Sequence, residues 1–148
     1  MARILFATVV CVLLSATVAS AQMPEIFVGY TNLQADRLHL LSVVFNLLDN
    51  ALKYSKEQPI IEIALEEGND SIQLRVSDNG IGIATEYKNK IFEKFFRIPT
   101  GNTHNAKGYG LGLSYVAHVV QKHNGKIYVD STLGKATTVT ISIPKRNA

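Results

Sequence analysis

The sequence lacks most features that would stabilise a fold through covalent bonds or metal ions. Cys11 is its single cysteine, which excludes an internal disulfide framework and any zinc or iron–sulfur site built from several cysteines. After Met23 the chain contains no internal repeat, low-complexity tract or interdomain linker. The net charge is only +3, from 15 basic and 12 acidic residues, so composition gives no argument for a nucleic-acid partner and we expect none.

What the sequence does contain is sufficient for one packed domain. Its 148 residues lie near the usual domain size of about 100 to 150 residues, so two full domains are excluded. Hydrophobic residues make up 47% of the chain and charged residues 18%, a balance that supports a hydrophobic core and argues against wholesale disorder.

Residues 1–22 differ from the rest of the chain. Arg3 precedes an uncharged run from Ile4 to Val18, and three small residues follow at 19–21. A positive start, an apolar run and a small-x-small cleavage site are typical of a secretory signal peptide. The alternatives are an uncleaved anchor, although a membrane span needs about 20 apolar residues, a buried N-terminal helix or strand, and a misplaced gene start. We therefore separate a signal-like or anchor-like segment, 1–22, from a domain at 23–148.

The hydrophobic periodicity of residues 23–148 predicts an α+β sandwich. Apolar residues spaced by three and four predict one helix from an N-cap at Asp36 to about residue 54 and another over 113–120. Alternation predicts strands at 61–66, 72–77, 127–131 and 137–144. A short amphipathic piece at 91–96 brings the tally to about three helices and at least four strands. Strands that are neighbours in sequence are expected to pair as hairpins, the first two through a turn at 68–70.

Asp78 breaks the pattern of its strand. It has the parity of the apolar residues in 72–76, so its carboxylate points toward the apolar layer if the strand continues that far. A buried carboxylate needs a hydrogen-bond donor. An Asx-type corner would supply one. The functional interpretation is a fixed acceptor for an exocyclic amino group such as that of adenine, with Thr137 reaching the same pocket and Gly80 and Gly82 letting a flat ring approach. The two interpretations are compatible.

A polar stripe interrupts the first predicted helix. Asn46, Asn50 and Lys53 stand at i, i+4 and i+7, which places them on one side of the helix. Solvated helix faces usually carry Glu and Lys, which are better helix formers than Asn. Two carboxamide oxygens one turn apart suit a hydrated cation such as magnesium, and the lysine suits phosphate. The alternative is a plain exposed stripe.

A glycine-rich stretch, Gly108 to Leu113, opens the second long helix. Backbone N–H groups at such a helix start form a phosphate cradle, because the first-turn amides are unpaired and the helix dipole favours anions there. The spacing is not that of a dinucleotide-binding fingerprint, and the sequence has neither a G-x-x-x-x-G-K-[ST] loop nor a protein-kinase glycine loop. The alternative is a flexible hinge beside the mobile loop that we predict over residues 99–110.

Taken in chain order, these segments resemble the ATP-binding catalytic domain of bacterial sensor histidine kinases, a branch of the GHKL, or Bergerat-fold, superfamily. Residues 46–55 resemble the N box, 78–83 the G1 box, 91–97 the F box and 107–113 the G2 box. Residues 134–138 stand where the last glycine motif of the family lies, with Ala136 in place of a glycine. The resemblance covers roughly residues 25–145. It implies a two-layer sandwich whose mixed, mainly antiparallel sheet carries about three helices on one face.

The resemblance also implies a site for ATP and Mg²⁺. Asp78 would accept a hydrogen bond from the adenine amino group with Thr137 in support, and Tyr54 would pack near the base. Asn50 would ligate Mg²⁺ with help from Asn46. The residues implied to act in catalysis are Asn46, Asn50, Lys53 and Arg97. The implied ATP-contacting set is Asn46, Asn50, Lys53, Tyr54, Asp78, Gly80, Gly82, Ile83, Phe95, Arg97, Lys107, Gly108, Tyr109, Gly110, Leu111, Gly112, Leu113 and Thr137.

A lid over the triphosphate is part of the same implication. It would run from about residue 92 to 112, with Arg97 and Lys107 contacting phosphate and the glycines at 108, 110 and 112 letting it fold over. The F-box phenylalanines would clamp the lid to the domain. Alternatively, these phenylalanines are ordinary side chains of the hydrophobic core.

The implied reaction is transfer of the γ-phosphoryl group of ATP to a histidine. The acceptor histidine of this family is typically followed by an acidic residue, and none of His39, His104, His118 and His123 fits that pattern. We therefore expect a catalytic module without its own acceptor, whose partners are a histidine-bearing dimerisation domain and, downstream, a response regulator. The alternatives are a non-catalytic ATP-binding or partner-docking module and a related GHKL serine kinase.

The expected location follows from the substrate. ATP is cytoplasmic, so the resemblance implies the cytoplasm or the cytoplasmic face of the inner membrane, with a membrane link through residues 4–21 as one possibility. This expectation conflicts with the export-signal pattern of residues 1–22.

Overall fold

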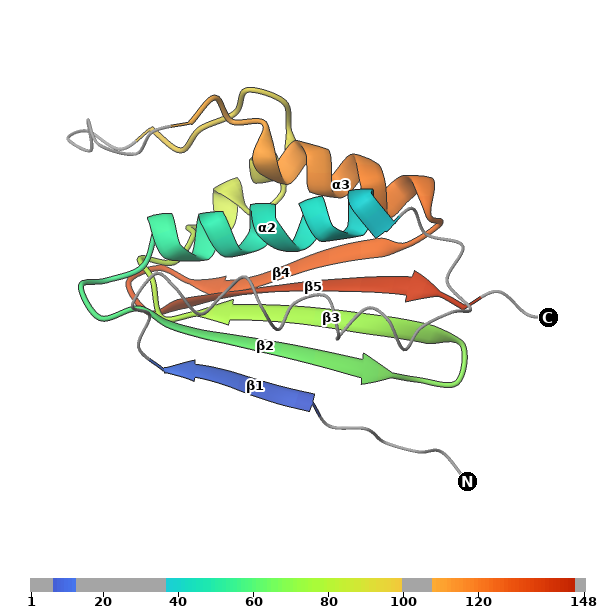
Figure 1. Cartoon of the computed structure of the whole chain (residues 1–148). Helices are drawn as coiled ribbons and strands as arrows, with labels where there is room; N and C mark the ends of the chain where they lie inside the picture. Colours follow the sequence, from blue (N-terminus) through green and yellow to red (C-terminus); the bar gives the residue numbers. More distant parts are fainter. Residues whose placement is uncertain (1–6, 13–36, 100–107, 146–148) are drawn as a thin grey trace.

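The fold is a two-layer α+β sandwich in which the helices cover one face of a single sheet (Figure 1). The computed structural model describes residues 7–12, 37–99 and 108–145. The described elements are β1 (Ala7–Val12), α2 (Arg37–Lys53), β2 (Ile60–Glu67), β3 (Ser71–Asp78), the 3-10 turns η1 (Thr85–Tyr87) and η2 (Lys90–Phe92), α3 (Gly112–Lys122), β4 (Lys126–Thr132) and β5 (Ala136–Pro144). The predicted fold class is confirmed.

The strands form one sheet in the order β1-β2-β3-β5-β4. Each neighbouring pair of these five described strands is antiparallel, so the parallel pairing that a mixed sheet would contain does not occur among them. The β2–β3 hairpin closes as predicted through the turn at 68–70, where the N–H of Gly68 donates to the carbonyl of Ser71 at 2.8 Å.

The prediction that strands adjacent in sequence pair as hairpins is wrong for β3 and β4, which do not pair. The second partner of β3 is β5, not β4. The chain between β3 and β4 forms η1, η2 and α3 on the helical layer, so β4 enters the sheet as an edge strand. β5 then returns antiparallel to β4 and fills the position between β4 and β3.

The backbone of β1 pairs with β2 along the other edge of the sheet, from Ala7 opposite Leu65 to Val12 opposite Ile60. A strand was one of the alternatives for this apolar run. Residues 1–6 and 13–22 lie outside the described ranges, and the assignment of 1–22 as an export signal stays a prediction. None of the helices in the described ranges has both the length and the apolar character that a membrane crossing requires.

The two long helices confirm the predicted periodicity. α2 ends at Lys53, as expected, whereas its predicted N-cap, Asp36, lies outside the described residues. α3 ends near Asn124, which adopts a positive φ of 53°, and the N–H of Gly125 bonds back to the carbonyl of Val120 at 2.9 Å. The amphipathic piece at 91–96 forms only the 3-10 turn η2, because the backbone becomes extended at Glu93, with φ −74° and ψ 144°.

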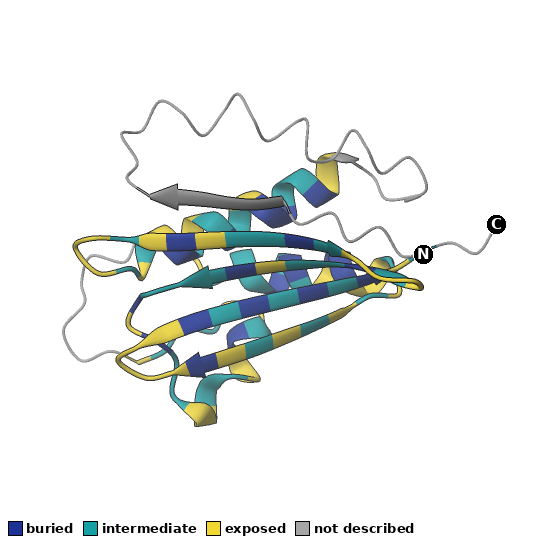
Figure 2. Ribbon diagram, turned by 90° about the horizontal axis from the view of Figure 1, so that it is seen from below, coloured by how far each residue is buried: buried dark blue, intermediate teal, exposed yellow. Residues whose placement is uncertain are grey.

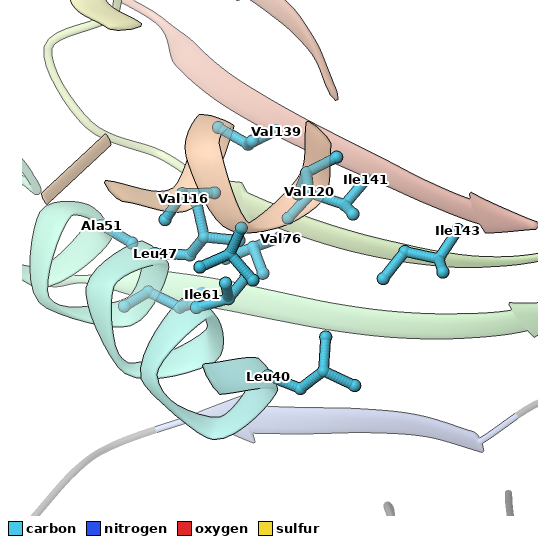
Figure 3. Close-up of a cluster of buried hydrophobic side chains, with 12 residues drawn as sticks. Leu40, Leu47, Ala51, Ile61, Val76, Val116, Val120, Val139, Ile141 and Ile143 are labelled. Atoms are coloured by element: carbon cyan, nitrogen blue, oxygen red, sulfur yellow. The ribbon is translucent and has the colours of Figure 1, made fainter. Parts of the chain in front are cut away.

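The hydrophobic core lies between the helices and the sheet. Figure 3 shows its side chains pointing toward one another from α2, α3 and the strands. Val116 of α3 is fully buried, and Ile141 of β5 is 1% exposed. Burial alternates along β5, because successive strand residues face opposite sides of the sheet (Figure 2).

The outer face of the sheet is more polar. There Arg75 forms an ion pair with Glu66 at 3.5 Å, and the hydroxyls of Ser77 and Thr138 lie 2.9 Å apart.

We expect Ile141→Ala to lower the free energy of unfolding by about 2 to 5 kcal/mol, because it removes buried methylenes and leaves a cavity. Ile60→Ala is the matched control, since Ile60 also lies in a strand but is 47% exposed. The control should change stability by less than about 0.5 kcal/mol. Urea unfolding of both variants measures the difference, and equal losses would contradict this description of the core.

Candidate functional site

A cavity of about 710 Å³ opens between α2, the start of α3 and the adjoining ends of β3 and β5. This volume lies within the range of about 300 to 1,000 Å³ that is usual for small-molecule and cofactor sites. The predicted site residues that line it are Asn46, Asn50, Lys53, Tyr54, Asp78, Gly82, Ile83, Arg97, Gly108, Tyr109, Gly110, Leu111, Gly112, Leu113 and Thr137. The fold thus brings together segments that are far apart in the sequence.

Three predicted residues are not part of this lining. Gly80 is buried beside it, where an added Cβ would collide with the carbonyl oxygen of Tyr54 and with the carboxylate of Asp78. Phe95 is 70% exposed, and its left-handed backbone is fixed by a 2.9 Å bond from its N–H to the carbonyl of Gly110. Lys107 lies outside the described residues.

Asp78 ends β3 and faces the cavity, as its parity predicts. The N–H of Gly80 donates to its Oδ1 at 2.8 Å, which is the expected Asx-type corner. Burial raises the pKa of the Asp78 carboxyl above its usual value of 3.8, and hydrogen bonds from the backbone of Gly80 and Thr137 oppose that shift. The carboxyl is therefore held in a fixed direction at a site that penalises its charge.

The corner after Asp78 packs closely against the β4–β5 turn. Gly82 has a φ of 69°, and a Cβ at this position would collide with the carbonyl of Thr132. The N–H of Gly134 donates to the carbonyl of Ile81 at 2.6 Å. Only glycine allows this approach, so Gly82 has a structural reason to be glycine as well as a place in the cavity wall.

Ser131 contacts two residues of the cavity lining, and the sequence analysis missed it. It lies opposite Thr137 in the β4–β5 pair, and the two hydroxyl oxygens are 2.9 Å apart. Its hydroxyl also accepts from the N–H of Ile83 at 2.8 Å. The strand pattern contained the signal, because Ser131 has the same parity as the inward-facing Ile127 and Val129.

The asparagines of α2 are oriented by their own helix. The side-chain amide of Asn46 donates to the carbonyl of Ser42 at 2.7 Å, and that of Asn50 donates to the carbonyl of Asn46 at 2.8 Å. Each amide oxygen is thereby turned away from the carbonyl of the preceding turn. A Cβ added to Gly112 would lie 2.9 Å from the Asn46 oxygen, so this oxygen faces the start of α3.

Two cationic side chains, Lys53 and Arg97, line the cavity. The Lys53 Nζ sits 5.7 Å from the centroid of the Tyr54 ring, and an added Cβ on Gly108 would come within 2.5 Å of it. Lys53 therefore lies beside the residue at which the description of the chain resumes after 100–107, and Arg97 stands shortly before that gap in the sequence.

The start of α3 also lies at the cavity wall. Leu111 occupies the N-cap position and provides no side-chain cap, so the N–H groups of the first turn have no side-chain acceptor there. Residues 108–113 line the cavity, which places the positive end of the helix dipole at its wall. This arrangement matches the predicted cradle for an anion.

The cavity lining combines groups of different chemistry. It contains the carboxylates of Asp78 and Asp49, the cations Lys53 and Arg97, and the start of α3. Apolar side chains, among them Ile81, Leu133 and Val139, make up much of the remaining wall. Such a site suits a molecule with a flat, amino-bearing ring at one end and a polyphosphate at the other. These are the features of a nucleotide-binding domain.

Comparison with known protein families shows which kind of nucleotide-binding domain this is. A family model described as "Histidine kinase-, DNA gyrase B-, and HSP90-like ATPase" matches residues 35–147. The chain belongs to this family, so the resemblance drawn from the sequence motifs is confirmed.

Similar proteins are sensor kinases. The chain is 44% identical over 112 residues to "Sensor protein RprX" of Bacteroides fragilis (strain YCH46), a match that covers 74% of this chain and 22% of the relative. It is 38% identical over 117 residues to "Sensor-like histidine kinase SenX3" of Mycolicibacterium smegmatis (strain ATCC 700084 / mc(2)155), covering 79% of this chain and 30% of the relative. The chain therefore spans less than a third of the length of these relatives.

Solved structures with the same fold include kinase domains. The mycobacterial sensor histidine kinase MprB superposes with a TM-score of 0.68 at 31% identity, covering 78% of each chain. The catalytic domain of histidine kinase ThkA, in a nucleotide-free form, superposes with a TM-score of 0.64 at 32% identity, covering 75% of this chain and 70% of that one.

The raised pKa of Asp78 makes stability depend on pH. The folded state binds this proton more tightly than the unfolded state, so the stabilisation is present below pH 3.8 and is lost as the pH rises through the folded-state pKa. The asparagine side chain of the Asp78→Asn variant does not titrate in this range, so it contributes no such pH dependence. We therefore expect the unfolding free energy of Asp78→Asn, relative to the parent, to increase from below pH 3.8 to neutral pH. Urea unfolding across this range measures it, and a pH-independent difference would contradict the assignment.

Proposed function

We propose that this domain binds Mg-ATP and acts as the phosphotransfer module of a histidine kinase in two-component signal transduction. The observation that carries the proposal is that one cavity is lined by the oriented Asp78 carboxylate together with Lys53, Arg97 and the start of α3. Family membership supports the ATP-binding part. The finer assignments rest on the geometry of this chain.

The adenine ring is proposed to lie at the Asp78 end. The carboxylate would accept from the exocyclic amino group, since its Oδ1 is already held by the N–H of Gly80 at 2.8 Å and cannot rotate freely. Tyr54 and Ile81, which are 39% and 46% exposed, would border the ring at the mouth of the cavity. Thr137 would present its hydroxyl beside the carboxylate.

The triphosphate is proposed to lie along the start of α3. First-turn N–H groups, Lys53 and Arg97 would neutralise its charge, which is the main requirement of phosphoryl transfer. Asn46 and Asn50 fit Mg²⁺, because amide oxygens are hard neutral ligands and magnesium keeps several water molecules. Bound Mg²⁺ would supply charge neutralisation on the phosphate oxygens. Among the described residues no cluster of His, Cys, Asp and Glu competes for a softer metal.

The proposed reaction forms a bond between an imidazole nitrogen and the γ-phosphorus. The bond from the γ-phosphorus to the bridging oxygen breaks, and ADP leaves with the electron pair. None of the described histidines, His39, His118 and His123, lines the cavity. The acceptor is therefore proposed to reach the cavity from a histidine-bearing dimerisation domain, and the phosphoryl group to pass on to a response regulator. Because ATP is cytoplasmic, the domain is proposed to work in the cytoplasm or at the cytoplasmic face of the inner membrane.

Isothermal calorimetry with Mg-ATP tests the binding step. We expect Asp78→Ala to weaken binding by about 10- to 100-fold, because it removes a hydrogen bond to a charged acceptor. Asn69→Ala is the control, since Asn69 lies in the turn at the opposite end of the β2–β3 hairpin and should leave binding unchanged. Absence of binding by the folded parent, or a normal affinity in Asp78→Ala, would refute the proposal.

Phosphotransfer is tested with labelled ATP and a separate histidine-bearing dimerisation domain. We expect acid-labile label on that domain, and loss of the label with Asn50→Ala, because the variant removes a proposed magnesium ligand. Binding of ATP without transfer would instead support a non-catalytic module. Acid-stable label on a serine would support the serine-kinase alternative.

A further inference from the structure

Three polar side chains stand in a row across the cavity end of the sheet. Asp78 of β3 lies opposite Thr137 of β5, and Thr137 lies opposite Ser131 of β4. Asp78 and Thr137 line the cavity. Ser131 lies outside the lining and is 8% exposed, so its hydroxyl acts on the cavity only through its neighbours.

The hydrogen bonds of Ser131 can be assigned from the number of protons available. A hydroxyl has one proton to donate and two lone pairs to accept with. Three groups surround the Ser131 oxygen: the N–H of Ile83 at 2.8 Å, the carbonyl of Ala136 at 2.8 Å and the hydroxyl of Thr137 at 2.9 Å. The N–H can only donate and the carbonyl can only accept. Ser131 therefore gives its single proton to Ala136, and accepts from Ile83.

The direction of the Thr137 hydroxyl follows from this assignment. Because the Ser131 proton is committed to Ala136, the bond between the two hydroxyls forms only if Thr137 donates its proton to Ser131. Thr137 then shows lone pairs to the cavity and no proton. The neighbouring Asp78 also accepts there, so the end of the cavity presents two adjacent acceptors.

We propose that Ser131 is a positioning residue that orients the Thr137 hydroxyl and so makes this end of the cavity select a purine with an amino group over one with a carbonyl. This inference rests on the proposed function, in that the cavity takes a nucleotide. An exocyclic amino group has two protons for two acceptors. A carbonyl oxygen at the same position meets lone pairs and no donor, and a buried polar group without a partner is unfavourable.

The test compares Mg-ATP with Mg-ITP, which carries a carbonyl in place of the adenine amino group and an N–H in place of the unprotonated adenine N1. Because this N–H is present with both proteins, the change in the ratio between parent and variant reports on the carbonyl. Calorimetric affinities for both nucleotides are measured on the full chain and on Ser131→Ala. In the variant the Thr137 hydroxyl can turn and donate to the carbonyl of ITP. We expect the parent to prefer ATP, and the ratio of the two affinities to fall by about fivefold in Ser131→Ala, as for one ordinary hydrogen bond.

Ser77→Ala is the matched control. The Ser77 and Thr138 hydroxyls also form a cross-strand pair at 2.9 Å, but on the outer face of the sheet. Removing this pair should leave the ATP-to-ITP ratio unchanged. The comparison separates the orientation of Thr137 from any general effect of losing a serine hydroxyl between two strands.

The ratio of ATP to ITP affinity shows whether Ser131 positions the Thr137 hydroxyl or only supports the fold. Loss of the bond to Ile83 alone would weaken ATP and ITP equally, and an unchanged ratio in Ser131→Ala would overturn the inference. A parent that binds both nucleotides equally well would overturn it too. A parent that binds neither refutes the proposed function instead.

A second variant covers the case in which Ser131→Ala does not fold. Thr137→Val keeps the shape of the side chain and removes the hydroxyl, so it should also weaken ATP and lower the ATP-to-ITP ratio. A parental ratio in a folded Thr137→Val protein would show that the hydroxyl plays no part in base selection, and would overturn the inference.

Discussion

The antiparallel pairing of β3 with β5 is the interaction on which the candidate site depends. Its register sets Val76 opposite Val139 in the core and Asp78 opposite Thr137 at the cavity, so packing and polar chemistry are specified by one ladder of hydrogen bonds. A shift of one residue would turn the apolar side chains to the solvent face, which a buried sheet face does not tolerate. The apolar pairs therefore also fix the position of the carboxylate.

The cavity combines groups that are individually unfavourable for stability. A half-buried carboxyl and an α3 start without a side-chain cap both cost free energy that an ordinary core would not, and Gly82 loses more backbone entropy on folding than another residue would. They lie at one end of the sandwich, and the apolar core around Val116 and Ile141 lies beside them. Such a separation lets the core supply stability while the other end keeps the strained and polar groups that a ligand site needs.

Much of the site could be predicted from residues that break their local pattern. Asp78 disturbs the alternation of β3, and the asparagines of α2 disturb an apolar helix, so both were found without tertiary information. Ser131 was missed although its parity in β4 indicated an inward side chain, because a single serine in a strand carries little signal. Phe95 was expected at the nucleotide and is 70% exposed instead. Its left-handed φ is a property of the loop, which hydrophobic periodicity does not predict.

The sequence by itself determined the helices, four of the strands, the family and most of the residues that line the cavity. These depend on local spacing and on motif order, which are readable along the chain. Only the tertiary structure decided that β5 lies between β3 and β4, that Ala7–Val12 pairs with β2, and that Ser131 meets Thr137. The first two are contacts between segments distant in sequence, and their energy comes from burying both partners together, which no local pattern records. The third lies within the β4–β5 hairpin, but it depends on the pairing register that sets the two side chains opposite each other.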